Sequence, residues 1–252
     1  MWGNPRLTNA AANALFALAL ALAAYVGARV LSESPAFALS TVVVGGELRH
    51  VTRDAIASAL QGKVRGTFFS VDLEAMRALF ESVLWVRRAE VRRQWPDRLE
   101  VHIKEHVALA RWGKGRESQL VNTHGELFSG QSDAPLPWFS GPAGSEGEIA
   151  RRYAAFRERL APLALEPGQV LLNPRFAWQL RLSNGLSVQL GRDSDKDRVE
   201  DRLARFVSVY PQTVGQSGGR LDYVDLRYPN GFSLRVPEVR KPETQKSARK
   251  RV

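Results

Sequence analysis

Three acidic residues have the most suggestive spacing in the chain. Asp193, Asp195 and Asp197 alternate like the first ligands of a calcium-binding loop. Such a loop needs a glycine at its sixth position and a glutamate at its twelfth, where this sequence has Arg198 and Ala204. The same carboxylates can cap the helix predicted by the residues that follow them. We therefore interpret them as the solvated start of a helix, without a bound metal.

Other residues capable of chemistry do not combine into a site either. His102 and His106 lie on one face of a predicted strand, about 13 Å apart, which is too far to share a metal ion. Residues 113–115 lack the further glycine and the helix of a phosphate-binding loop. The chain has no cysteine, which excludes disulfides, thiolate nucleophiles and thiolate metal sites. The sequence thus predicts a protein that is not an enzyme and that uses no metal or cofactor.

Residues 10–30 decide where the remaining elements are placed. They are uncharged up to Arg29, and this uncharged part spans roughly 28 Å at about 1.5 Å per residue, against a hydrocarbon core about 30 Å thick. A buried core helix would show a polar face, which is absent here. A cleaved signal peptide is the stronger alternative, because Arg6 precedes the run and small residues end it. The length favours a retained transmembrane helix, with residues 1–9 in the cytoplasm.

The formal net charge of +10 would suggest a nucleic-acid partner for a cytosolic chain. Part of this charge is local, because residues 237–252 contain six Lys and Arg against two Glu, a net of +4. So charged a segment, with few apolar residues, is predicted to be disordered. Since the transmembrane helix carries the rest of the chain across the inner membrane, we expect neither a nucleic-acid partner nor a small-molecule substrate.

Residues 36–107 are predicted to form a first domain with the order strand, helix, helix, strand, strand. Alternating apolar and polar residues indicate the last two strands, which are joined by a turn at Pro96. A sheet with one face packed on two helices explains this alternation. The expected elements are the strand 39–44, two helices with Thr52 and Asp72 as N-caps, and the strands 85–93 and 99–107.

Residues 108–236 are predicted to form a second, larger domain. Short apolar strands alternate there with two amphipathic helices, one after a Ser145-x-x-Glu148 capping box and one from about Asp195. Asn230-Gly231 is a turn sequence typical of a final hairpin. The expected fold class is α+β, with a single N-terminal transmembrane helix, a β-α-α-β-β domain and a larger, mostly antiparallel β-sheet domain with helices.

Motifs in both domains resemble one known family. In the first domain they are Phe68-Phe69-Ser70-Val71-Asp72, Trp85-Val86, and Ala89-Glu90-Val91-Arg92-Arg93-Gln94-Trp95-Pro96 followed by Leu99, Val101 and Glu105. In the second they are Leu190-Gly191-Arg192, Arg202-Leu203-Ala204-Arg205-Phe206, Tyr223-Val224-Asp225-Leu226-Arg227-Tyr228 and Asn230-Gly231-Phe232. The first domain looks like the polypeptide-transport-associated (POTRA) domain of the bacterial FtsQ/DivIB cell-division family, and the second like that family's C-terminal β domain. Leu84 and Ala108 depart from the family pattern, which often has proline at both positions.

This resemblance implies a scaffold of the divisome, the set of division proteins at the septum. It implies an inner-membrane protein with a single span, a cytoplasmic N-terminus and periplasmic domains, enriched at the septum. Its β domain is expected to bind FtsB and FtsL, and its POTRA domain other divisome proteins, while the lipid bilayer is contacted through residues 10–30. From the POTRA-like domain alone, a chaperone or polypeptide-translocation component is the alternative.

The predicted binding surface centres on the last strand. An edge strand exposes backbone groups that a partner's extended segment can complete by strand addition. Tyr228 and Phe232 are the expected apolar anchors, and neighbouring arginines are expected to pair with acidic residues of a partner. The alternative is that the aromatic residues pack in the core and that the arginines are ordinary solvated surface. The predicted partner-binding residues are Arg192, Glu200, Arg202, Arg205, Arg227, Tyr228, Asn230, Gly231, Phe232, Ser233, Leu234 and Val236.

Overall fold

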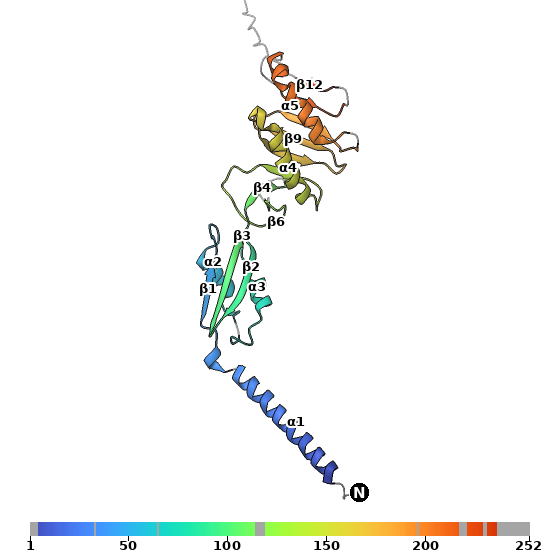
Figure 1. Cartoon of the computed structure of the whole chain (residues 1–252). Coiled ribbons are helices and arrows are strands. Elements are labelled where there is room, and N and C mark those ends of the chain that lie inside the picture. Colours follow the sequence, from blue (N-terminus) through green and yellow to red (C-terminus); the bar gives the residue numbers. More distant parts are fainter. Residues whose placement is uncertain are drawn as a thin grey trace, which may run out of the picture. The chain divides into compact units, whose positions relative to one another are not determined.

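The structure, a computed structural model, is formed by two compact units, residues 1–106 and 107–252 (Figure 1). It describes residues 5–32, 34–64, 66–113, 119–195, 197–216, 221–228 and 231–235. The predicted tail 237–252 lies outside the described residues, as do Asn230 and Val236. Each unit has its own sheet and its own hydrophobic core.

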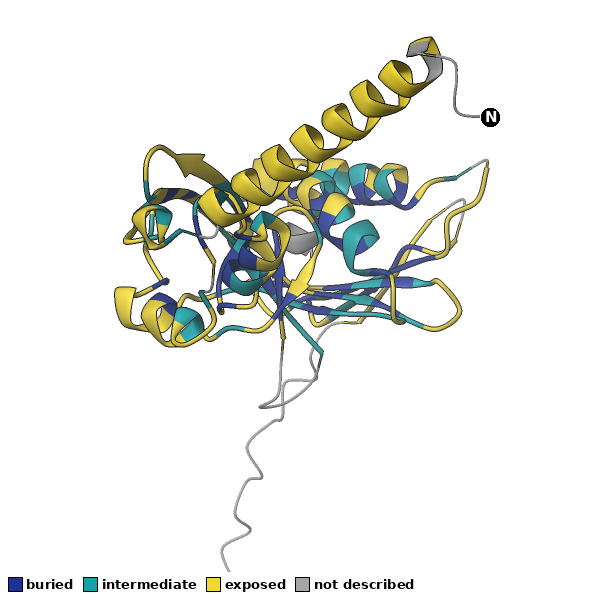
Figure 2. Ribbon diagram, turned by 90° about the horizontal axis from the view of Figure 1, so that it is seen from below, coloured by how far each residue is buried: buried dark blue, intermediate teal, exposed yellow. Residues whose placement is uncertain are grey.

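The first unit begins with one long apolar helix, α1 (Pro5–Ser32). Within Thr8–Ser32, an 18-residue stretch has a mean hydropathy of 2.0, and none of that stretch is buried against the rest of the chain. Figure 2 shows the helix exposed along its described length. Alanine and leucine favour the helix, and the absence of charge along most of it makes it long and apolar enough to cross a membrane. The prediction of a membrane-spanning helix at this position is confirmed to that extent.

A three-stranded sheet and two helices form the rest of the first unit. The sheet order is β1-β3-β2, with β1 parallel and β2 antiparallel to β3. The predicted N-cap of the second helix is confirmed, because Asp72 Oδ1 accepts hydrogen bonds from the amides of Glu74 and Ala75. The elements are the 3-10 helix η1 (Pro35–Phe37), β1 (Thr41–Gly45), α2 (Arg53–Leu60), α3 (Leu73–Glu81), β2 (Val86–Gln94) and β3 (Arg98–Glu105).

The second unit is built on one nine-stranded sheet with the order β12-β11-β10-β9-β8-β7-β4-β5-β6. Its strands are β4 (Ala108–Trp112), β5 (Gln119–Asn122), β6 (Leu127–Phe128), β7 (Trp138–Ser140), β8 (Pro167–Leu172), β9 (Trp178–Leu182), β10 (Ser187–Gly191), β11 (Tyr223–Asp225) and β12 (Ser233–Arg235). Its helices are α4 (Glu146–Leu160), η2 (Ala161–Leu163) and α5 (Val199–Gln216). α5 begins a few residues later than expected from the sequence.

The pairing of this sheet is mostly antiparallel, as predicted: among the described strands, five of the eight neighbouring pairs are antiparallel. Three neighbouring pairs among the described strands are parallel: β4 with β7, β7 with β8, and β10 with β11. Parallel neighbours need a crossover connection, and α4 and α5 supply it for the last two pairs. The final β11–β12 pair is antiparallel, as predicted for the last hairpin.

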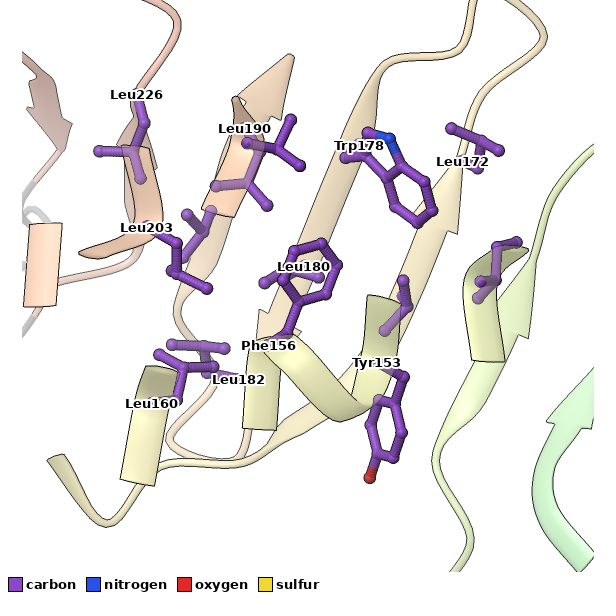
Figure 3. Close-up of a cluster of buried hydrophobic side chains, with 14 of the residues drawn as sticks. Tyr153, Phe156, Leu160, Leu172, Trp178, Leu180, Leu182, Leu190, Leu203 and Leu226 are labelled. Atoms are coloured by element: carbon purple, nitrogen blue, oxygen red, sulfur yellow. The ribbon is translucent and has the colours of Figure 1, made fainter. Parts of the chain in front are cut away.

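One hydrophobic core joins α4 and α5 to the large sheet. Phe156 and Leu160 of α4 point towards Leu180 and Leu182 of β9, and Leu203 of α5 lies in the same cluster (Figure 3). All five side chains are at most 3 % exposed. Along β9, the alternation of the strand places Trp178, Leu180 and Leu182 on this face and Gln179 and Arg181 on the other. The core therefore fixes α5 against the end of the sheet that carries β12.

Candidate functional site: the last strand and the surface beside it

The last strand lies at one edge of the nine-stranded sheet. Among the described strands β12 pairs only with β11, where Leu234 stands opposite Val224. An edge strand leaves a row of backbone N–H and C=O groups without a strand partner. The geometry therefore permits one more extended segment to be added beside β12.

A hollow of about 410 Å³ adjoins this edge. Phe206 of α5 and Leu226 contribute its buried apolar side, and Tyr228 and Phe232 contribute its exposed side. The rings of Phe232 and Phe206 meet edge to face, with their centroids 6.2 Å apart. Tyr228 is 56 % exposed, whereas Phe232, at 36 %, is partly used in packing. The hollow thus combines a packed floor with an exposed aromatic rim, a form suited to receiving an apolar side chain.

Arg202 holds this region together from the inside. Its guanidinium donates to the backbone carbonyls of Leu190, Arg192 and Asp197 and to the Asp197 carboxylate. Only 8 % of its side chain is exposed. Because its donors are occupied within the chain, Arg202 positions the start of α5 against β10. Its pairing with a partner stays a prediction, since Arg202 also lines the hollow beside β12.

Two other predicted arginines do face solvent. The Arg205 side chain is 53 % exposed while it bonds Asp197, and the Arg227 side chain is 58 % exposed while it makes a bidentate pair with the buried carboxylate of Asp225. Hydrogen bonds from Arg227 hold the pKa of Asp225 below its ordinary value, and those from Arg202 and then Arg205 do the same for the pKa of Asp197. Each arginine thus keeps an exposed cationic face beside the hollow.

Glu200 lies in the first turn of α5, and Arg192 directly follows β10. Glu200 Oε1 is 3.1 Å from Arg152 Nη1 of α4, and Arg152 also pairs with Asp193 and lies over the ring of Trp178. Burial alone would raise the pKa of Asp193, but the hydrogen bonds from Arg152 and from the Val199 amide, together with the charges of Arg152 and Arg202, outweigh it and the pKa is lowered. Glu200 is therefore engaged by its own chain, whereas Arg192 is exposed.

The structure brings most of the predicted set together around the last strand. Arg205, Arg227, Tyr228, Gly231, Phe232, Ser233 and Leu234 belong to this surface, which we call the β12 surface. Arg192 and Glu200 belong to the neighbouring cluster around Arg152, and Arg202 is internal. Within the described residues no group of three or more His, Asp or Glu side chains is placed to hold a metal ion.

Comparisons with known proteins give the same family for both units. The family model described as "POTRA domain, FtsQ-type" matches residues 37–106, and the one described as "Cell division protein FtsQ/DivIB, C-terminal" matches residues 110–227. A cell division protein FtsQ from Burkholderia pseudomallei is 43% identical over 243 residues, covering 95% of this chain and 96% of the relative. The chain belongs to the FtsQ family of cell division proteins.

Two further FtsQ relatives extend this comparison. That of Nitrosospira multiformis is 42% identical over 240 residues, covering 93% of this chain and 99% of the relative. That of Escherichia coli is 35% identical over 214 residues, covering 81% and 75%. Membership of the FtsQ family gives this protein a role in the divisome as a cell-division scaffold, and its apolar N-terminal helix fits a single-pass membrane protein.

Sequence reasoning missed two features of this FtsQ chain. The cluster around Arg152 gave no local signal, because its members come from α4, the loop at Asp193 and the start of α5. The internal role of Arg202 was hidden because its acceptors Leu190 and Arg192 are backbone carbonyls, which carry no sequence signature. The available clue to the internal role of Arg202 was its short spacing from Asp197 in the sequence, just as Arg227 lies close to Asp225.

Proposed function

We propose that this protein is a bitopic inner-membrane scaffold that links septal division proteins by binding them at the β12 surface. The observation that carries the proposal is the edge position of β12, which pairs with β11 alone among the described strands, beside a hollow with an exposed aromatic rim. A partner's extended segment adds to β12 through main-chain hydrogen bonds, and its side chains give the specificity.

The β12 surface specifies the chemistry of this segment. An apolar side chain of the segment enters the hollow next to Tyr228 and Phe232. Acidic side chains of the segment meet Arg205, Arg227 and Arg235, all of which are exposed. By the family resemblance, the segment belongs to FtsB, in its pair with FtsL, while residues 36–107 recruit other divisome proteins. In this arrangement the N-terminus is cytoplasmic, residues 36–236 are periplasmic, and the protein is enriched at the septum.

Replacing Tyr228 by alanine tests the binding surface. Tyr228 is 56 % exposed, so its loss removes an anchor of the hollow without removing a core side chain. We expect at least about 30-fold weaker binding to FtsB, as for a binding hot spot. The measurement is co-purification from membranes and titration of the full-length chain with FtsB in detergent.

A matched control is available in the same unit. Phe176 is 62 % exposed and is not among the residues that line the hollow beside β12, so Phe176→Ala should leave FtsB binding unchanged. Equal binding by the Tyr228→Ala variant and the parent chain would rule out this surface. Arg227→Glu is a poorer test, because it places a second carboxylate against the buried Asp225 and disturbs the fold.

The proposed topology has a separate test. An alkaline phosphatase fused after Val236 is active only outside the cytoplasm, so the proposal expects an active fusion. An active cytoplasmic reporter at the same place would overturn the periplasmic location of both units.

A further inference from the structure

The turn between β2 and β3 carries an unusually exposed aromatic side chain. Trp95 is 72 % exposed, the same fraction as Phe16 in the apolar helix α1. An exposed tryptophan costs free energy in water, because its ring is largely apolar, and it normally marks a binding surface or a membrane interface. Trp95 lies outside the β12 surface and belongs to the other unit.

Basic side chains surround Trp95. Residues 92–98 contain three arginines and one aspartate, a net charge of +2. The side chains of Arg92 and Arg98 are 76 % and 55 % exposed, and their nearest acidic contacts, Glu90 and Asp97, are loose at 3.7 and 3.9 Å. Arg93 differs, because it donates a hydrogen bond to the carbonyl of Val71. The turn therefore presents an indole between two available guanidinium groups.

The contacts of this turn hold it near the end of α1. The amide of Ser40 donates to the carbonyl of Asp97 at 3.0 Å, and the Ser40 hydroxyl bonds the Asp97 carboxylate. Ser40 follows the last residue of α1, Ser32, by eight positions, which limits the separation to about 27 Å even for an extended chain. The 3-10 helix η1 lies between Ser32 and Ser40 and shortens the distance that this segment can span. The Thr67 hydroxyl also donates a hydrogen bond to the carbonyl of Ser32, which ties the end of α1 to the folded part of the unit.

Further aromatic side chains lie along the same connection. Phe37 of η1 packs edge to face on Phe69, with the ring centroids 5.1 Å apart, and Phe69 is 49 % exposed. The carbonyl of Phe37 accepts a hydrogen bond from the amide of Phe68. The segment that follows the membrane helix is therefore fastened to the folded part of its unit by main-chain bonds as well as by side chains.

We propose that the β2–β3 turn docks on the surface of the bilayer that α1 crosses, with Trp95 in the interface and Arg92 and Arg98 on lipid phosphates. Tryptophan favours the headgroup level of a membrane, where its ring is buried and its N–H stays hydrated. Arginine binds phosphate through a bidentate fork, and basic residues near a surface are attracted by anionic lipids. Docking sets the orientation of the first unit on the membrane.

Spin labelling in nanodiscs tests this proposal on the full-length chain. Since the chain has no cysteine, Gln94→Cys gives a single labelling site next to Trp95. Glu47→Cys gives a control site just after β1, the strand whose last residue lies opposite His102 of β3. The accessibility of each nitroxide to oxygen and to a water-soluble nickel complex reports its depth. In nanodiscs with anionic phospholipid we expect the label at position 94 at headgroup depth and the label at position 47 in water.

Substitutions then show whether the side chains cause the docking. Trp95→Ala, or Arg92→Ala with Arg98→Ala, should return the position-94 label to water, and each arginine removed should lower the docked-to-undocked ratio about fivefold. High salt or purely zwitterionic lipid should act like the loss of the arginines. All three side chains are exposed, so circular dichroism should show an unchanged fold.

Three outcomes would overturn the proposal. The first is a position-94 label in water in anionic nanodiscs, including the case in which it becomes protected only when another division protein is added, which would assign the turn to a protein partner. The second is a label that stays at headgroup depth in a variant that combines Trp95→Ala, Arg92→Ala and Arg98→Ala, which would mean that the connection to α1 alone places it. The third is an identical depth at positions 94 and 47.

Discussion

The two sheets of this protein end in edge strands of opposite character. β2, at one edge of the small sheet, is nine residues long and carries the four arginines 87, 88, 92 and 93. β12, at one edge of the large sheet, has three residues. A long edge is the more hazardous of the two, because it offers more backbone groups for unwanted pairing. Length alone would therefore have made β2 the expected site of strand addition.

The neighbouring helices reverse that expectation. The amide of Ala89 in β2 donates a hydrogen bond to Glu81 Oε1 of α3, so part of this edge is already engaged. Beside β12, α5 instead leaves a hollow lined by Phe206 and Phe232. Under the proposed function, the edge that binds a partner is the one whose adjacent helix leaves it open and supplies a pocket. Charge and a helix side chain protect the other edge.

The largest effect is expected from breaking the support behind β12. Arg202→Met removes a buried guanidinium that satisfies three backbone carbonyls and one carboxylate, and should lower the free energy of unfolding of the second unit by about 3–5 kcal/mol. Urea denaturation of the full-length chain in detergent measures this change.

Arg205 provides the matched control for Arg202. It lies on the same helix and binds the same aspartate, but its side chain is 53 % exposed, so Arg205→Met should cost less than about 1 kcal/mol. If both substitutions cost the same, Arg202 is not the internal support of the β12 surface.

A smaller effect is expected from opening the protected edge. Glu81→Ala leaves the buried amide of Ala89 without its acceptor, at a cost of about 1–3 kcal/mol, and exposes β2 to pairing with another chain. We expect concentration-dependent self-association in analytical ultracentrifugation. Glu81→Gln retains an acceptor and should stay monodisperse, and so should Glu74→Ala, which removes only the other ion pair of Arg77. Self-association of all three variants would show that Glu81 does not guard this edge.

Much of the fold was predictable from local pattern. The uncharged run gave α1, and the strict alternation of residues 99–105 gave β3, whose apolar side chains Leu99, Val101 and Ile103 are at most 1 % exposed. The Asp72 cap was also predictable, because its acceptor and donors lie within three residues. Local signals succeed where the interacting groups are neighbours in sequence.

The errors arose where tertiary contacts outweigh the local pattern. The Ser145-x-x-Glu148 spacing predicted a capping box, but the Ser145 hydroxyl donates to the carbonyl of Pro142, and Glu148 binds Arg151 and Arg152 instead. Arg202 was expected at the surface because charged residues are rarely buried without a partner. Its partners are mostly backbone carbonyls brought near by the fold, which the sequence does not display.

The smallest effect on stability is expected from lowering the pH, because solvent screens the ion pair between the exposed Arg227 and Asp225. The pKa of Asp225 is lower in the folded protein than in the unfolded chain, chiefly through Arg227. Its contribution to stability is therefore complete above about pH 4 and is lost as the pH falls through the folded pKa. Since Asp225 stands opposite Ser233, hydrogen exchange should accelerate in β12 in acid before it does in β2.

Asp225→Asn should remove most of this pH dependence, and Asp222→Asn, at an exposed neighbour, should not. An equal acid response of both edges would mean that the Asp225–Arg227 pair does not hold β12 in place.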